Sequence, residues 1–194
     1  GVWITDPDNP DQSPDGRGNI NSAIGLGTAY TFVLKEYHGA SQVELAGSFN
    51  NWNPGEIFLS KEADSWTVKY FLGPGTHTYK FIVDGEWIPD PENTNTIGTG
   101  NYVNSVLTIE SNHEFRLNGY ANASVVYVSG SFNDWSKEGY KMNKVDGKWI
   151  FPIHLSPGKY TYKFIVDKQW ILDPNNDLWE ENEHGTDNSV LWIN

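Results

Sequence analysis

Short segments in which apolar and polar residues alternate cover most of the chain, and this pattern predicts β-strands. In the first half they lie at residues 30–34, 43–46, 66–72, 76–83 and 103–109. Gly, Pro and Asn separate them, and no stretch has a convincing helical period. The pattern therefore predicts an all-β chain built from immunoglobulin-like (early-set) β-sandwiches.

The pattern of the first half repeats in the second. Residues 79–84 (YKFIVD) recur 83 residues later at 162–167, and both copies continue with Trp-Ile and then Asp-Pro. A period near 80 residues has the size of a domain. We therefore expect two tandem β-sandwiches, residues 29–110 and 111–194, joined by a short linker.

Residues 1–28 contain part of the same pattern. Residues 3–9 (WITDPDN) resemble residues 87–93 (WIPDPEN), and residues 21–22 (NS) match residues 104–105. We interpret 1–28 as the tail of a truncated preceding repeat or an N-terminal extension, and we expect the chain, which starts at Gly1, to be a mature or excised product. The aspartates of residues 1–28 lack the ligand spacing of a calcium-binding loop, so we predict a turn and no metal site in this segment.

Composition and charge narrow the class of ligand. Aromatic residues reach 14% with nine Trp, more than two small cores usually need, so some rings should be exposed for contact. The net charge of −12 argues against nucleic acid and anionic membranes as partners. No membrane-length apolar run or signal peptide is visible, and the lack of cysteine fits several compartments. We favour an extracellular, cell-surface or periplasmic bacterial location over a cytoplasmic one.

Three features recur beyond the needs of a core. They are a tryptophan in a turn, a lysine in a strand, and a second tryptophan just past a hairpin turn, together with an asparagine at the start of the last strand. Their members are Trp52, Lys80, Trp87 and Asn104 in the first repeat and Trp135, Lys163, Trp170 and Asn188 in the second. Indoles stack on the apolar face of a glucose ring, while an amine and a carboxamide bind hydroxyls at its rim.

The ordinary alternative for a repeated aromatic residue is the core. Trp66 and Trp149 lie in alternating segments and are predicted to be core residues, as are the repeated phenylalanines. Lys80 and Lys163 could instead lie on a solvated edge, and the asparagines could satisfy turns. Trp179 and Trp192 have no counterpart in the first repeat, and their role stays open.

Catalysis receives little support from the sequence. There is no nucleophile elbow, phosphate-binding glycine loop or zinc-ligand spacing, and the five histidines do not recur in register. Asp90 and Asp173 recur, but beside proline, where a role in a turn is sufficient. We predict no catalytic residue, no cofactor and no metal.

In combination, residues 47–52 (GSFNNW), the YKFIVD hairpin with its Trp and Asp-Pro, and residues 185–188 (GTDN) resemble carbohydrate-binding module family 48. That family includes the glycogen-binding domain of the AMP-activated protein kinase β subunit. The resemblance implies that the repeated tryptophans stack on α-1,4-linked glucose and that the lysines, the asparagines and Thr186 contact its hydroxyls. Where Thr186 stands, the first repeat has Tyr102, and the family's leucine is replaced by Gly100 and His184.

We therefore predict a non-catalytic pair of modules that binds starch, glycogen or maltooligosaccharides. One alternative is a pair of accessory modules from a larger glycoside hydrolase family 13-type enzyme acting on starch or glycogen. Another is a regulatory or protein-interaction β-sandwich that does not bind sugar. Further repeats or an attached catalytic domain are possible partners.

Overall fold

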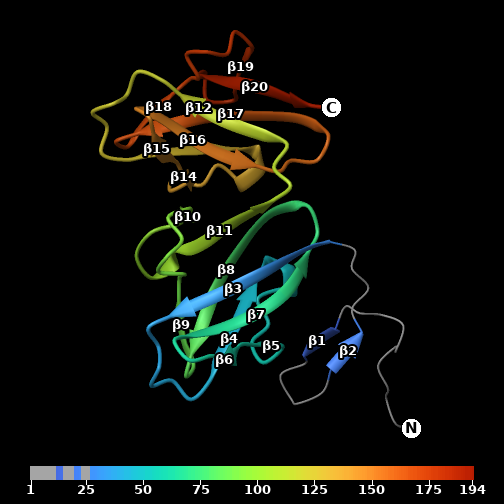
Figure 1. The fold of residues 1–194 in the computed structure, drawn as a ribbon. Helices are drawn as coiled ribbons and strands as arrows, with labels where there is room; N and C mark the ends of the chain where they lie inside the picture. Colours follow the sequence, from blue (N-terminus) through green and yellow to red (C-terminus); the bar gives the residue numbers. More distant parts are fainter. Residues whose placement is uncertain (1–11, 15–19, 23–26) are drawn as a thin grey trace.

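The computed structural model describes residues 12–14, 20–22 and 27–194, and it shows two β-sandwiches stacked end to end (Figure 1). The first combines a three-stranded sheet, β3–β7–β6, with the sheet β10–β11–β8–β4–β5, in which β9 pairs with β8. Its strands are β3 (Thr28–Lys35), β4 (Val43–Gly47), β5 (Ile57–Phe58), β6 (Ser60–Lys61), β7 (Ser65–Leu72), β8 (Gly75–Val83), β9 (Glu86–Ile88), β10 (Thr96–Ile97) and β11 (Asn104–Ile109).

The second sandwich has the same topology. Sheet β12–β16–β15 faces sheet β14–β13–β17–β20–β19, and β18 pairs with β17. Its strands are β12 (His113–Leu117), β13 (Val126–Gly130), β14 (Tyr140–Lys141), β15 (Asn143–Val145), β16 (Lys148–Ile153), β17 (Gly158–Val166), β18 (Gln169–Ile171), β19 (Trp179–Glu181) and β20 (Asp187–Ile193). All pairings are antiparallel, which confirms the predicted all-β sandwich fold.

Each sandwich has its own core, made by the alternating residues identified in the sequence. Trp66 and Trp149 are 6% exposed, as predicted for core residues, and their indole N–H groups donate to the carbonyls of Tyr37 and Tyr120. Phe81 and Phe164 are fully buried. The two cores therefore contain Trp66 and Trp149, whereas the tryptophans of the turns and hairpins lie outside them.

The turn at residues 47–52 explains how its tryptophan leaves the core. A short 3-10 turn, η1 (Ser48–Asn50), leads into Asn51 and Trp52, which both have positive φ, and Trp52 N–H bonds back to the Gly47 carbonyl at 2.9 Å. A Cβ at Gly47 would lie 2.4 Å from the carbonyl oxygen of Thr78, so only glycine fits beside β8. The turn thus holds the Trp52 indole outside the core, beside Trp87.

The same turn recurs in the second repeat. It contains η3 (Ser131–Asn133), followed by positive φ at Asp134 and Trp135. A Cβ at Gly130 would lie only 2.3 Å from the Thr161 carbonyl oxygen, so glycine is required here for the same steric reason.

The repeated Tyr and Asp-Pro positions form a partly buried hydrogen-bond network. Tyr79 donates to Asp90 at 2.6 Å and Asn93 donates to the Tyr79 oxygen at 3.1 Å. Burial, and then the bond to Asp90, raises the pKa of Tyr79, so the phenol stays protonated and keeps donating. Tyr162, Asp173 and Asn176 repeat this network. Its effect is to fix the turn that leads to the closing hairpin of each repeat.

Specific contacts join the two sandwiches. Thr108 donates to the Pro152 carbonyl at 3.1 Å, and the amide of His154 donates to Thr76 at 3.0 Å. Gly98 N–H donates to the Glu138 carbonyl at 3.1 Å, and Val106 packs into the second core. The Gly98 bond holds the start of the closing loop of the first repeat, residues 98–103, against the second repeat; this loop includes the 3-10 turn η2 (Gly100–Tyr102).

A third hairpin precedes the first sandwich. β1 (Gln12–Pro14) pairs with β2 (Ile20–Ser22) so that Asn21 stands opposite Ser13, as Asn188 of β20 stands opposite Glu180 of β19. This register agrees with the interpretation of 1–28 as the end of a preceding repeat, which stays a prediction because most of that segment, including the aspartates of the rejected calcium loop, lies outside the described residues. In the described part of the chain, no helix has the length and apolar character needed to cross a membrane.

Candidate functional site

The two turn tryptophans of the second repeat come together on the outer face of its larger sheet. Trp135 comes from the turn after β13 and Trp170 from β18, and their ring centroids are 6.2 Å apart with a 42° angle between the planes. Trp170 is 40% exposed, and Trp135 is half-buried. The pair forms a bent aromatic surface open to solvent.

Polar side chains form a connected cluster beside these rings. Lys163 Nζ donates to Thr186 Oγ1 at 3.1 Å, and Asn182 Nδ2 donates to the same oxygen at 2.8 Å. Asn182 also donates to Asn188 Oδ1 at 3.0 Å, and Asn188 is 7% exposed. Because Thr186 accepts both bonds, its own hydroxyl hydrogen remains to be donated to a ligand.

All five residues predicted in the second repeat line one open hollow of about 480 Å³. They are Trp135, Lys163, Trp170, Thr186 and Asn188, joined by Lys137, Asn182, Glu183 and His184. The hollow combines apolar ring faces with an amine, a hydroxyl and carboxamides. Such a lining suits a polar but uncharged ligand with an apolar face.

The first repeat assembles its tryptophans in the same way but not its polar groups. Trp52 and Trp87 lie 6.3 Å apart at 40°. Lys80, however, is only 8% exposed, and its amine donates to the Asn101 carbonyl at 3.1 Å rather than to a threonine. Asn104 begins β11 at the same sheet position as Asn188, and Tyr102 is 84% exposed.

The structure adds Asn182 and Lys137 to the residues predicted for the second site. Asn182 lies in the closing loop, which is one residue longer in the second repeat, so comparison of the two repeats finds no equivalent of Asn182 in the first. Its position four residues before Thr186 is the only feature of the sequence that could have pointed to it. Neither repetition nor strand alternation selects Lys137, which lies in a loop after the tryptophan turn.

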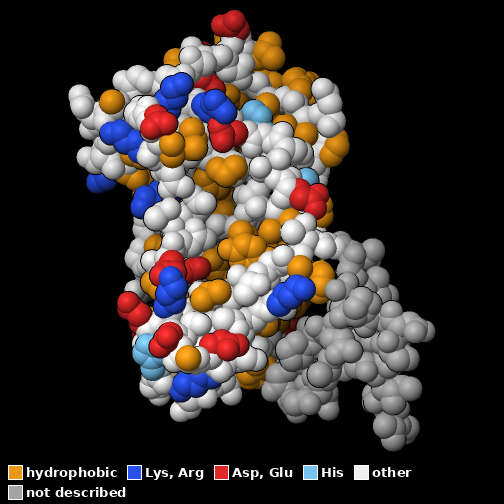
Figure 2. Space-filling model, viewed as in Figure 1, with side chains coloured by type: hydrophobic (Ala, Val, Ile, Leu, Met, Phe, Trp, Pro, Cys, Tyr) orange, Lys and Arg blue, Asp and Glu red, His pale blue; other side chains and the backbone are white. Residues whose placement is uncertain are grey.

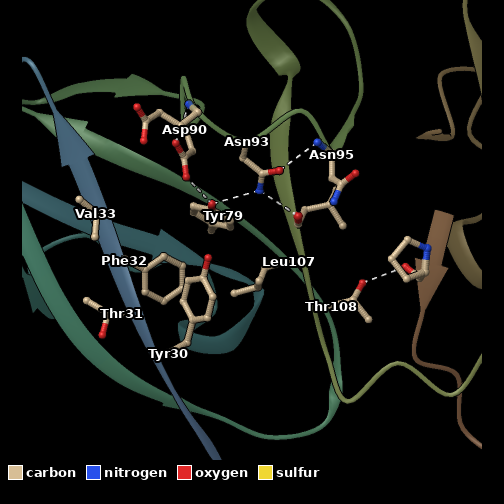
Figure 3. A pocket seen from close by; sticks show the side chains of 13 residues that line it. Tyr30, Thr31, Phe32, Val33, Tyr79, Asp90, Asn93, Asn95, Leu107 and Thr108 are labelled. Atoms are coloured by element: carbon tan, nitrogen blue, oxygen red, sulfur yellow. Dashed lines mark hydrogen bonds between the residues drawn. The ribbon is translucent and has the colours of Figure 1, made fainter. Parts of the chain in front are cut away.

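A second hollow of about 390 Å³ lies where the sandwiches meet, away from every predicted site residue (Figure 3). Tyr30 and Phe32 of β3 and Leu107 of β11 supply apolar walls, and Thr108 points across to Pro152. Its central polar groups, the Tyr79–Asp90–Asn93 network, already bond one another. We therefore assign this hollow to the junction and not to ligand recognition.

Charge is mixed around the molecule. On the face drawn in Figure 2, acidic and basic side chains are interspersed, and hydrophobic side chains gather in the middle, where the sandwiches meet. In the described ranges, no group of three or more histidine or acidic side chains is arranged to hold a metal ion. The tryptophan hollow offers ring faces for stacking and polar side chains for hydrogen bonds.

A β-sandwich with paired solvent-facing indoles beside amine, hydroxyl and carboxamide groups defines a carbohydrate-binding module. The chain belongs to the family described as the glycogen recognition site of AMP-activated protein kinase, whose model matches it twice, at residues 30–116 and 114–194. It is thus a tandem of two such modules.

Curated relatives agree with this family. The chain is 38% identical over 81 residues to 5'-AMP-activated protein kinase subunit beta-1 of Sus scrofa, covering 40% of this chain and 62% of that protein. It is 39% identical over 72 residues to the human subunit beta-2, covering 36% of this chain and 26% of that protein. The chain therefore spans less than two thirds of these relatives.

Among solved structures, a maltogenic amylase from S. marinus aligns with 88% of this chain and 29% of its own. The TM-score is 0.38 and the sequence identity 17%.

Proposed function

We propose that this chain binds α-glucans such as starch, glycogen or maltooligosaccharides without acting on them, and that the second repeat is the stronger site. The observation that carries this proposal is the single hollow in which Trp135 and Trp170 lie beside Lys163, Thr186 and Asn188.

The geometry of the rings favours a curved chain. Two indole planes tilted by 42° cannot both lie flat against an extended ribbon of β-1,4-linked sugars. An α-1,4-linked glucan bends along its length, so that consecutive glucose units can each present an apolar face to one ring. The tilt thus supports the α-linked class.

The polar cluster beside the two indoles would orient the bound sugar through hydrogen bonds to its hydroxyls. Lys163 donates, Thr186 donates through its remaining hydrogen, and the Asn188 carboxamide donates and accepts, whereas the Asn182 carboxamide is fully used in holding Thr186, Asn188 and the loop. Each hydrogen bond contributes about 1 kcal/mol net, so stacking should supply most of the affinity and these groups the choice of sugar. Two modules on one polymer then gain avidity where both can engage.

Affinity electrophoresis in gels containing amylopectin or glycogen tests the proposal. The wild-type chain should be retarded, and Trp135→Ala with Trp170→Ala should lose most of that retardation. The matched control is Trp179→Ala with Trp192→Ala, because these indoles are 59% and 60% exposed but lie outside the hollow. Absence of retardation in the wild type would contradict glucan binding and favour a protein-interaction role. Equal losses in both double variants would move the site.

A further inference from the structure

A third hollow, of about 340 Å³, adjoins the tryptophan site of the second repeat. Trp170 and Lys137 line both hollows, so the two adjoin at these side chains. We propose that this hollow is an extension subsite, in which a longer α-glucan chain continues past Trp170. This inference rests on the proposed function and deepens it.

Strand register explains the apolar floor of this hollow. Trp170 stands opposite Ile165 on the neighbouring strand, and Ile165 stands opposite Tyr127. Residues that face one another in antiparallel strands project to the same side of a sheet, so these three side chains form a row across β18, β17 and β13. The row extends the aromatic surface by one tyrosine, about one strand spacing beyond Ile165.

Polar groups surround this row. Lys137, Glu138, Lys168 and Thr99 line the hollow with the aromatic residues. Lys168 has φ of 75°, in the left-handed region, at the hairpin position that Gly85 occupies in the first repeat. Glycine fits this backbone conformation best, but the second repeat has a lysine here, and its side chain borders the hollow.

Thr99 belongs to the first repeat. The preceding residue, Gly98, donates its amide to the Glu138 carbonyl at 3.1 Å, which holds the closing loop of the first repeat at the rim of the hollow. The extension subsite is thus a composite of both modules. A single module of this fold would have no such wall.

The first repeat has no equivalent aromatic row. Glu44 takes the place of Tyr127 opposite Ile82, and it is 9% exposed. Its carboxylate accepts from the Gly55 amide at 2.5 Å and from the Gln42 side chain at 2.6 Å. The loop after the Trp52 turn therefore closes over the position where the second repeat is open.

The test compares short and long ligands in the full chain carrying Trp52→Ala and Trp87→Ala, so that the first site does not contribute. Calorimetry would measure the affinities of maltotriose and maltoheptaose. Adding Tyr127→Ala should lower the maltoheptaose affinity by about threefold to tenfold, the value of one aromatic contact, and leave maltotriose unchanged. Tyr127→Phe, which keeps the ring, should retain the maltoheptaose affinity.

Amide spectra supply a second readout of the composite wall. In the same background, maltoheptaose should shift the Thr99 amide resonance and maltotriose should not. Unchanged maltoheptaose binding by Tyr127→Ala, or an unmoved Thr99 resonance, would overturn the extension subsite while the proposed function stands. Failure of both ligands to bind the wild-type chain would overturn both.

Discussion

The two repeats share a topology, a tryptophan turn and a partly buried Tyr–Asp network, but their strand lysines have different partners. Lys163 reaches the side chain of Thr186 in an open hollow. Lys80 is buried against the backbone of Asn101, and the neighbouring Tyr102 points into solvent. The aromatic platform is therefore retained in both modules, whereas the polar half of the site depends on the closing loop.

The two lysines show that the same repeated position can serve either the structure of the closing loop or the ligand site. The lysine of β8 donates to the backbone of its closing loop, whereas the lysine of β17 donates to the threonine side chain two positions before the asparagine and also lines the hollow. The second repeat has a threonine there and one more residue in the loop, which admits Asn182 to the cluster. We therefore expect the second site to bind with hydrogen-bond specificity and the first mainly by stacking.

The largest expected effect is on the tryptophan turn itself. Gly130→Ala would place a methyl group 2.3 Å from the Thr161 carbonyl oxygen and should lower the free energy of unfolding by about 3 kcal/mol, with loss of the second site. Gly47→Ala should damage the first site similarly. Urea unfolding and gel retardation would measure both. Gly73→Ala, whose added methyl meets nothing within 4 Å, is the control, and equal destabilisation by it would contradict the steric argument.

Loss of one indole should distinguish the sites without unfolding either. Trp170→Ala should weaken α-glucan binding by about 2 kcal/mol, roughly thirtyfold, because stacking supplies most of the affinity. Trp87→Ala removes an indole of the same 40% exposure from the first repeat. Calorimetry with maltoheptaose should give it the smaller loss. A larger loss from Trp87→Ala would reverse our ranking of the sites.

The threonine hydroxyl is the sharpest test of the polar difference. Thr186→Val removes the acceptor of Lys163 and Asn182 at constant shape and should cost about 1 kcal/mol of binding, roughly fivefold. Tyr102→Phe is the matched change in the first repeat. Titration with maltotriose should show no effect of Tyr102→Phe. If both variants bind like the wild type, the closing loop does not set affinity.

The smallest expected effect concerns the hairpin that borders the extension subsite. Lys168→Gly should raise the free energy of unfolding by up to about 1 kcal/mol, because glycine adopts positive φ without a Cβ penalty. Gly85→Lys should lower the stability of the first repeat by a similar amount. Chemical denaturation would measure the pair. A loss of stability in Lys168→Gly would show that the lysine side chain makes a favourable contact at the hollow.

Much of this arrangement was predictable because repetition and alternation are local signals. The strand pattern located the core positions of Trp66 and Trp149, and the glycine and asparagine turn separated Trp52 and Trp135 from them. The hairpin at Asp84 and Gly85 has the positive φ values that its residues predict.

The remainder depends on contacts between distant segments. The burial of Lys80 is set by a loop more than 20 residues away, and the role of Asn182 depends on an insertion that the internal alignment skips. Tyr127 reads as an ordinary strand residue until the register places it opposite Ile165. Thr99 could not be assigned to the neighbouring module without the junction bond of Gly98.

The closing loop of the first repeat borders both candidate sites. At Asn101 it accepts the amine of Lys80, and at Thr99 it lines the hollow beside Trp170. A ligand at the first site and a long glucan at the second would therefore contact the same short segment. If binding at one site moved this loop, linkage would require that occupancy of either site alter the affinity of the other by the same factor.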